Sequence, residues 1–242
     1  MSRDTTQEPL LLVEKLSAGY GEMLAITDID LRIYRAEIVA LIGSNGAGKS
    51  TLLRALSRVL PCTGRIVLNG RELSAATSDQ VFALGMVQVP EGRQLFGRMS
   101  VHDNLLMGAY RRSDKSAIAQ DLERIYEMFP RLAERRRQMA GSMSGGEQQL
   151  CALARALMAS PILIMVDEMS LGLAPIIVEQ LMDILVGIRR NGVTVFLVEQ
   201  DIHLALSIAD RGYVMETGRI VQSGPARELV DDPKVRHAYL GT

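Results

Sequence analysis

A glycine-rich loop between an apolar run and a helical pattern constrains this chain more than any other segment. The residues ALIGSNGAGKST at 40–51 fit the pattern G-x-x-x-x-G-K-[ST] from Gly43 to Ser50. An apolar run with strand character precedes the loop and a helical pattern follows it, which is the context in which this pattern cradles phosphate. A strand–loop–helix unit of this kind needs a sheet with helices packed on it, so the segment predicts an α/β nucleotide-binding core.

Each residue type in the loop has a chemical reason to be there. Glycines at 43, 46 and 48 let the backbone wrap closely around phosphates and aim its amides inward. Lys49 would neutralise the β- and γ-phosphate oxygens, which also makes it a catalytic candidate, and Ser50 would offer its hydroxyl to Mg²⁺. The residues expected to bind the nucleotide here are Gly43, Ser44, Asn45, Gly46, Ala47, Gly48, Lys49, Ser50 and Thr51.

Strand and helix patterns alternate along the rest of the chain. The runs PILIMVDE at 161–168 and GVTVFLVEQ at 192–200 are continuously apolar, as in parallel strands buried on both faces, and an amphipathic helix pattern at 175–190 separates them. Shorter patterns predict strands within 9–20, 27–43, 64–70 and 85–89, the first two of them in an antiparallel layer, and a helix at 49–60 that Pro61 ends.

The segment between the short strands and PILIMVDE has a different character. A polar loop at 90–100 leads into a helical pattern at 101–137 that has charged faces and a break at Pro130. We therefore predict a single domain over residues 1–242, with a helical subdomain of roughly 92–142 inserted in the core.

Two acidic residues end the run PILIMVDE. Asp167 is placed to hold Mg²⁺ through water, and Glu168 is placed to act on an attacking water as a general base. Acidic residues also end strands at the surface without any function, but the phosphate loop in the same chain favours the metal-site interpretation.

A second phosphate-binding element is predicted at GSMSGGEQQL, residues 141–150. Ser144 is a natural N-cap, Gly145 and Gly146 leave backbone amides bare, and Glu147 opens a strong helix-forming run. The unpaired N–H groups and the positive end of the helix dipole favour an anion at such a terminus. The alternative is an ordinary capped helix that binds nothing.

Together, the phosphate loop, SMSGGEQQ and VDE resemble the ATP-binding cassette family over almost the whole chain, and SGGEQQ is highly specific for it. The resemblance implies a P-loop NTPase core of the RecA-like type, with a mainly parallel sheet, an N-terminal antiparallel β layer and a helical subdomain. It also implies that two cassettes meet head to tail. Ser144, Gly145 and Gly146 would then bind the γ-phosphate of the ATP that the partner holds, with ATP and Mg²⁺ as cofactors.

Three further positions match the family residue by residue. Tyr20 stands where the family stacks an aromatic ring on adenine. Gln200, in LVEQD, replaces a histidine that contacts the γ-phosphate in most members and so becomes a catalytic candidate. Glu91, in VPEGRQLF, replaces a glutamine that links Mg²⁺ to the membrane subunit, and Gln88 is the alternative if the register slips.

Longer stretches of the sequence indicate which type of ATP-binding cassette protein the chain resembles. VPEGRQLFGRMSVHDNL, SLGLAP, FLVEQDIHLAL and the ending AYLGT closely resemble the LivF type of ATPase subunit in branched-chain amino-acid importers. This implies a second, identical or paralogous ATPase subunit, integral membrane permease subunits and, indirectly, a periplasmic substrate-binding protein. It places the chain at the cytoplasmic face of the bacterial inner membrane as a peripheral subunit. The ATPase of a urea or short-amide importer is the nearest alternative.

Composition and sequence patterns also bear on the other functions that this chain could have. The net charge of −1 gives no field that would attract nucleic acid, and no apolar stretch approaches the ~18 residues needed to cross a bilayer. A soluble genome-maintenance ATPase of the same superfamily usually carries a long coiled coil, whereas residues 52–140 show no sustained heptads. A non-catalytic regulatory cassette stays open as an alternative because Glu91 and Gln200 depart from the common pattern.

Overall fold

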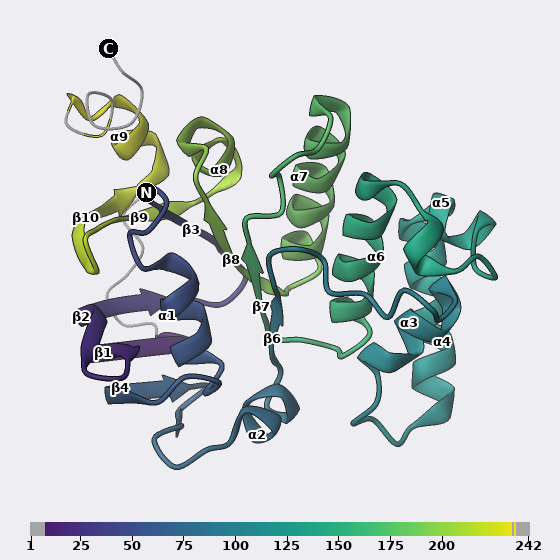
Figure 1. Ribbon diagram of the computed structural model, residues 1–242, viewed down its shortest axis with the longest axis horizontal. Helices are drawn as coiled ribbons and strands as arrows, with labels where there is room; N and C mark the ends of the chain where they lie inside the picture. The colour runs from purple at the N-terminus through teal and green to yellow at the C-terminus, as the bar shows by residue number, and fades with distance from the viewer. Residues whose placement is uncertain (1–7, 234, 236–242) are drawn as a thin grey trace.

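The computed structural model describes residues 8–233 and 235. Within these residues the chain forms two β-sheets with helices packed around them (Figure 1). The two ends of the predicted 1–242 domain and the motif AYLGT at 238–242 lie outside the described residues.

The larger sheet carries the phosphate loop. Its strand order over the described residues is β10-β9-β3-β8-β7-β6, with all neighbours parallel except β10 and β9. The strands are β3 (Ile38–Ile42), β6 (Met86–Val89), β7 (Leu163–Asp167), β8 (Thr194–Glu199), β9 (Arg211–Glu216) and β10 (Arg219–Pro225). The mainly parallel sheet predicted from the sequence is confirmed.

The smaller sheet is antiparallel and lies beside helix α1 (Figure 1). Its order is β2-β1-β4-β5, formed by β1 (Leu11–Tyr20), β2 (Met23–Ile33), β4 (Cys62–Leu68) and β5 (Arg71–Glu72). This confirms the predicted antiparallel layer.

The helices follow the predicted pattern with some differences. They are α1 (Lys49–Leu56), α2 (Ser78–Ala83), α3 (Val101–Gly108), α4 (Lys115–Met128), α5 (Pro130–Glu134), η1 (Ala140–Ser142), α6 (Gly145–Leu157), α7 (Pro175–Arg190), α8 (Ile202–Ile208) and α9 (Ala226–Asp231). The predicted end of α1 at residue 60 is wrong, because the chain leaves the helix after Leu56 and Arg58 adopts a left-handed φ of 57°. The sequence patterns did not assign α2, α8, α9, β9 and β10.

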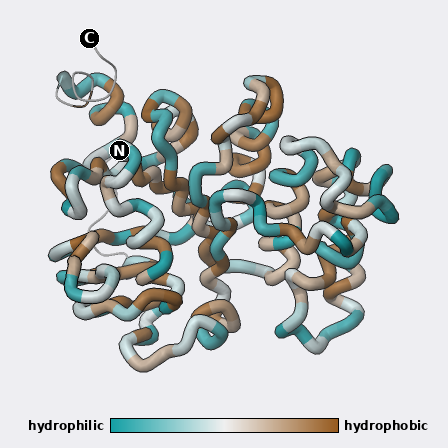
Figure 2. Tube along the Cα trace, in the orientation of Figure 1, coloured by the Kyte–Doolittle hydropathy of each residue, from teal (hydrophilic) through white to brown (hydrophobic). Residues whose placement is uncertain are grey.

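Alternating residues of the central strands face two hydrophobic clusters. In β3, Ile38, Ala40 and Ile42 belong to one cluster, and Val39 and Leu41 belong to the other. Helices including α6, α7 and α8 cover the first face, whereas α1 and the antiparallel sheet cover the second. Figure 2 shows the resulting concentration of hydrophobic residues along the central strands. Burial on both faces explains why these strands read as continuous apolar runs.

Helices α3, α4 and α5 lie at the end of the molecule beyond α6 (Figure 1). α3 packs closely on α6, where a Cβ placed on Gly108 would lie only 1.9 Å from the carbonyl oxygen of Arg155. That residues 92–142 form a separate subdomain remains a prediction. In the part of the chain that the structure describes, no helix is long and apolar enough to span a membrane.

Candidate nucleotide and magnesium site

The phosphate loop leaves β3 at its carboxyl end and enters α1 through a backbone conformation that favours glycine. Gly46 and Gly48 have φ values of 82° and 107°, a region that side chains with a Cβ rarely occupy. A Cβ on Gly43 would lie 2.4 Å from the carbonyl oxygen of Met215, so no larger residue fits there. Gly48 is the N-cap of α1 and supplies no side-chain cap, which leaves the first amides of α1 for a ligand.

Lys49 is buried at the centre of the loop, with 4% of its surface exposed. Its Nζ donates to the carbonyl oxygens of Gly43 at 2.8 Å and Ser44 at 3.1 Å. The same Nζ lies 3.0 Å from Oε1 of Glu168, which follows β7. The ammonium is therefore held by the loop that would bind the phosphates and by the carboxylate expected to act as the base.

Asp167, the last residue of β7, lies within reach of Ser50. The Ser50 hydroxyl donates to Oδ1 of Asp167 at 3.3 Å. Burial is the main reason that the pKa of Asp167 is raised to about 6, and the negative charges of Glu168 and Glu91 also raise it. The hydrogen bond from Ser50 and the positive charge of Lys49 act in the opposite direction. The structure thus brings together the residues that the sequence assigned to the metal.

Oxygen donors around this point suit Mg²⁺. A cavity of about 490 Å³ is lined by Ser50, Asp167, Glu91 and Gln88 among other residues. Within the described residues no cluster of three or more His, Cys, Asp or Glu side chains could hold a metal alone. Mg²⁺ is commonly held by one or two carboxylates together with substrate phosphates and water, so the residues present fit that ion.

Glu91 and Gln88 occupy different positions at the edge of this cavity. Gln88 lies in β6, where its Oε1 accepts a hydrogen bond from the Ser57 hydroxyl at 2.9 Å. Glu91 follows the strand and is exposed. The Gln88 side chain is thus held by a hydrogen bond to Ser57, the C-cap residue of α1. The Glu91 side chain is exposed at the edge of the cavity. That Glu91 helps to bind Mg²⁺ stays a prediction.

Tyr20 lies at the end of β1 beside the start of α1. Its hydroxyl accepts a hydrogen bond from Nη1 of Arg54 at 2.9 Å, and a hydrogen bond with Thr51 lowers its pKa. The side chain is 49% exposed, so its ring remains open to a flat ligand on the outside of the loop.

Gln200 directly follows β8 and is exposed. The residues on either side of it are fixed. Asp201 caps α8, since its Oδ1 accepts from the backbone N–H of Leu204 at 3.0 Å, and Glu199 is buried with 2% exposure. Sequence analysis did not single out Glu199, although a carboxylate at the end of a continuous apolar run was a visible signal.

The second predicted element, Ser144–Gly146, forms the N-terminus of α6 as expected. Ser144 and Glu147 make a capping box, and the Ser144 hydroxyl donates to Oε2 of Glu147 at 2.8 Å. Glu147 also lies 2.7 Å from Nε of Arg135. A Cβ on Gly145 would lie 2.9 Å from Nη2 of Arg93, an arginine to which sequence analysis attached no role.

The two elements predicted to bind phosphate contact different parts of the chain. The loop 43–51 joins Tyr20, Asp167 and Glu168 through hydrogen bonds and an ion pair. Among the described residues, none of the hydrogen bonds or ion pairs connects Ser144–Gly146 with that loop. The structure therefore brings together one half of the predicted site and leaves the other half on a separate element.

Comparison with known proteins places these features in a family context. The family model described as "ABC transporter" matches residues 26–170. A branched-chain amino-acid transport ATP-binding protein, BraG of Pseudomonas aeruginosa, is 48% identical over 96% of this chain and 100% of its own length. A probable LivF protein of Archaeoglobus fulgidus is 33% identical over 96% of this chain and 99% of its own length.

Solved structures agree with the fold. The crystal structure of an ATP-binding cassette of an ABC transporter in its ADP conformation has a TM-score of 0.86 and 25% identity. It covers 98% of this chain and 100% of that chain. A nucleotide-free cassette of an ABC transporter has a TM-score of 0.85 with 24% identity, covering 97% of this chain and 100% of that one.

Proposed function

We propose the following role for this chain, which belongs to the ABC transporter family: it is an ATP-hydrolysing subunit of an importer for branched-chain amino acids. The convergence of Lys49, Ser50, Asp167 and Glu168 at the phosphate loop carries the catalytic part of the proposal. The 48% identity to BraG over nearly the full length of both chains supports the transported substrate class.

The chain's own residues supply binding and proton transfer. The amides of the loop and Lys49 would hold the β- and γ-phosphates, and the Tyr20 ring would stack on adenine. Ser50, Asp167 and Glu91 would hold Mg²⁺, which when bound would neutralise charge on the phosphate oxygens. Glu168 would take a proton from water as the water oxygen bonds to the γ-phosphorus and the bond to the β-phosphate oxygen breaks, leaving ADP and phosphate.

The ion pair between Lys49 and Glu168 implies an exchange during binding. Lys49 Nζ lies 3.0 Å from Glu168 Oε1. When phosphates arrive, the ammonium has stronger anionic partners and can release the carboxylate. Glu168 would then be free to accept a proton, so that nucleotide binding and activation of the base are linked.

Ser144, Gly145 and Gly146 would complete the site of a second cassette arranged head to tail. The Ser144 hydroxyl donates to Glu147, so it would have to turn toward the partner's γ-phosphate when the pair closes. Gln200 would donate its side-chain N–H to the γ-phosphate of the chain's own nucleotide. The partner is a second copy or a paralogue.

Coupling to transport needs a membrane partner. We assign the chain to the cytoplasmic face of the bacterial inner membrane, peripherally docked on permease subunits that receive amino acids from a periplasmic binding protein. Nucleotide-driven closure of the pair would be transmitted to the permease through the exposed segment near Glu91 and the helices of 92–142. No nucleic acid takes part.

Phosphate release from ATP tests the catalytic part. E168Q should keep ATP binding and lose about 10²–10⁴-fold in turnover, which is the usual contribution of a positioned general base. E179Q provides a matched control, because Glu179 is an exposed carboxylate on α7. Turnover near the wild-type value in E168Q would remove Glu168 from the role of base.

Uptake by whole cells tests the substrate class. In cells that lack this chain but retain its permease, the wild-type gene should restore import of labelled leucine, and K49A should not. Restored uptake of labelled urea without leucine uptake would favour the urea or short-amide importer instead. Hydrolysis by the purified chain with no effect on any uptake would favour a soluble, non-transport ATPase.

A complementation experiment tests the head-to-tail arrangement when the chain pairs with itself. G145D would place a carboxylate beside the partner's γ-phosphate, and like charges ~4 Å apart repel by roughly 4 kcal/mol at an effective dielectric constant of ~20. G145D alone and K49A alone should both be inactive. In a mixed pair both defects fall in one site and the other site is intact, so mixing should restore hydrolysis. A mixture that stays inactive while G145D also loses its own ATP binding would contradict the arrangement.

A further inference from the structure

Glu199 is a buried carboxylate to which the roles above give no task. It is the last residue of β8 and only 2% exposed. Its two oxygens accept hydrogen bonds from the backbone N–H of Ser170 at 3.1 Å and from the Ser170 hydroxyl at 2.8 Å. Burial raises the pKa of Glu199, and the hydrogen bonds from Ser170 oppose that shift. A buried charge needs donors of this kind, so its position is closely determined.

Strand alternation separates Glu199 from the metal site. Phe196 and Val198 of β8 belong to the cluster on the α1 side, whereas Val195 and Leu197 belong to the cluster on the α7 side. Side chains alternate along a strand, so Glu199 points to the α7 side. Asp167 continues the alternation of Leu163 and Met165 toward α1. The two carboxylates therefore lie on opposite faces of the sheet.

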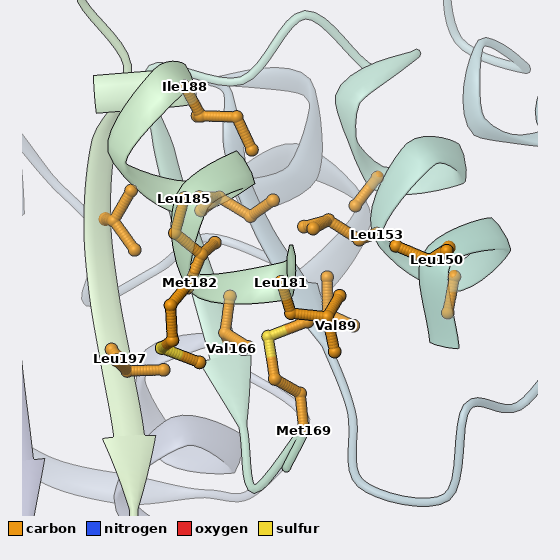
Figure 3. Close-up of a cluster of buried hydrophobic side chains, with 14 of the residues drawn as sticks. Val89, Leu150, Leu153, Val166, Met169, Leu181, Met182, Leu185, Ile188 and Leu197 are labelled. Carbon is orange, nitrogen blue, oxygen red and sulfur yellow. The ribbon is translucent and has the colours of Figure 1, made fainter. Parts of the chain in front are cut away.

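The segment that Glu199 holds begins at the proposed base. Glu168 has a left-handed φ of 41°, a conformation that costs free energy unless its surroundings hold it in place. Met169 is 1% exposed, and its side chain lies beside Val89 and Leu181 in the hydrophobic cluster (Figure 3). Ser170, the next residue, is fixed by Glu199. The strained residue is thus anchored on its C-terminal side by one apolar and one polar contact.

The segment on the other side of Glu199 contains Gln200. Gln200 directly follows Glu199 in the chain, and Asp201 caps the following helix. Gln200 lies between Glu199 and Asp201 in the chain, and its side chain is exposed. The buried carboxylate therefore ties the segment that follows Glu168 to the residue that directly precedes Gln200.

We infer that Glu199 is a positioning residue that locks the loop Glu168–Ser170 to Gln200, so that the base and the γ-phosphate contact are held in a fixed relation. The inference rests on the proposed function, because it assumes that Glu168 and Gln200 act on ATP. Because Glu199 lies on the face of the sheet opposite Asp167, the inference assigns it no contact with the metal. Its effect is on geometry, and misplacement of catalytic groups by about 1 Å can cost on the order of 100-fold in rate.

Steady-state ATP hydrolysis tests this assignment. E199A should lower kcat by about 10–100-fold with little change in KM for ATP, because the phosphate loop is untouched. E199Q keeps an acceptor for the Ser170 N–H and should retain most of the activity. S170A should lower kcat as well, and the E199A/S170A double variant should be no worse than E199A, since both changes break the same contact.

A stability control separates positioning from folding. L185A truncates a fully buried side chain of α7 and should lower the melting temperature without lowering kcat at a temperature well below melting. If E199A fails to fold, S170A and E199Q still test the contact. Equal losses in E199Q and E199A, or additive losses in the double variant, would overturn the lock. An inactive wild-type chain would instead contradict the proposed function, so the two failures are distinguishable.

Discussion

The fold buries the Asp167 carboxylate at a free-energy cost, which leads to a prediction about stability. The side chain is 3% exposed at the end of β7, and burial raises its pKa from 3.8 to about 6. Asp167→Asn replaces the charge with a neutral amide of nearly the same shape, whose oxygen can still accept from Ser50. We expect this substitution to stabilise the nucleotide-free protein at neutral pH and to abolish Mg²⁺-dependent hydrolysis.

The magnitude follows from the pKa values of the folded and unfolded chain. A change from 3.8 to about 6 corresponds to roughly 3 kcal/mol at about 1.4 kcal/mol per pKa unit. Between these values the folded state binds more protons than the unfolded state, so the free energy of unfolding falls as pH rises through this window. Above pH 6 the full cost is present, whereas at pH 4.5 only about 1 kcal/mol of it remains.

Urea denaturation without nucleotide and with a chelator is the appropriate assay. At pH 7.5 the free energy of unfolding of D167N should exceed that of the wild type by about 1–3 kcal/mol, with the difference shrinking toward pH 4.5. D183N is the matched control, because Asp183 is exposed on α7 and should leave stability nearly unchanged. A less stable D167N at pH 7.5, or a gain that does not depend on pH, would refute the reasoning.

Three further predictions concern other parts of the chain. G108A should lower the free energy of unfolding by about 1–3 kcal/mol in urea titrations, because its Cβ would lie 1.9 Å from the Arg155 carbonyl oxygen, and an unchanged midpoint would argue against that close approach. Q200A should lower ATP turnover while Q200H is tolerated; full activity in Q200A would place the γ-phosphate contact elsewhere. Burial raises the pKa of the Cys151 thiol to about 11, so iodoacetamide at pH 8 should label Cys62 first, as read by peptide mass spectrometry, and equal labelling of the folded chain would contradict it.

The parts of the fold that sequence analysis predicted are those with a strong local signal. The loop 40–51, the apolar runs at 161–168 and 192–200, and the helix at 175–190 each carry a period or motif that few other structures satisfy. The short elements α2, α8 and α9 carry little periodicity, and their ends depend on caps such as Thr77 for α2. A short helix of this kind forms mainly because the rest of the molecule packs against it.

The candidate site shows the same difference between features with a local sequence signal and features that depend on tertiary packing. The sequence by itself determined which groups could bind phosphate, hold a metal or move a proton, because these properties belong to residue types at fixed spacing. Only the tertiary structure decided that Lys49 pairs with Glu168 and that Glu199 holds Ser170. These contacts join residues far apart in the chain, and their distances depend on the twist, order and alternation of strands that no local pattern encodes.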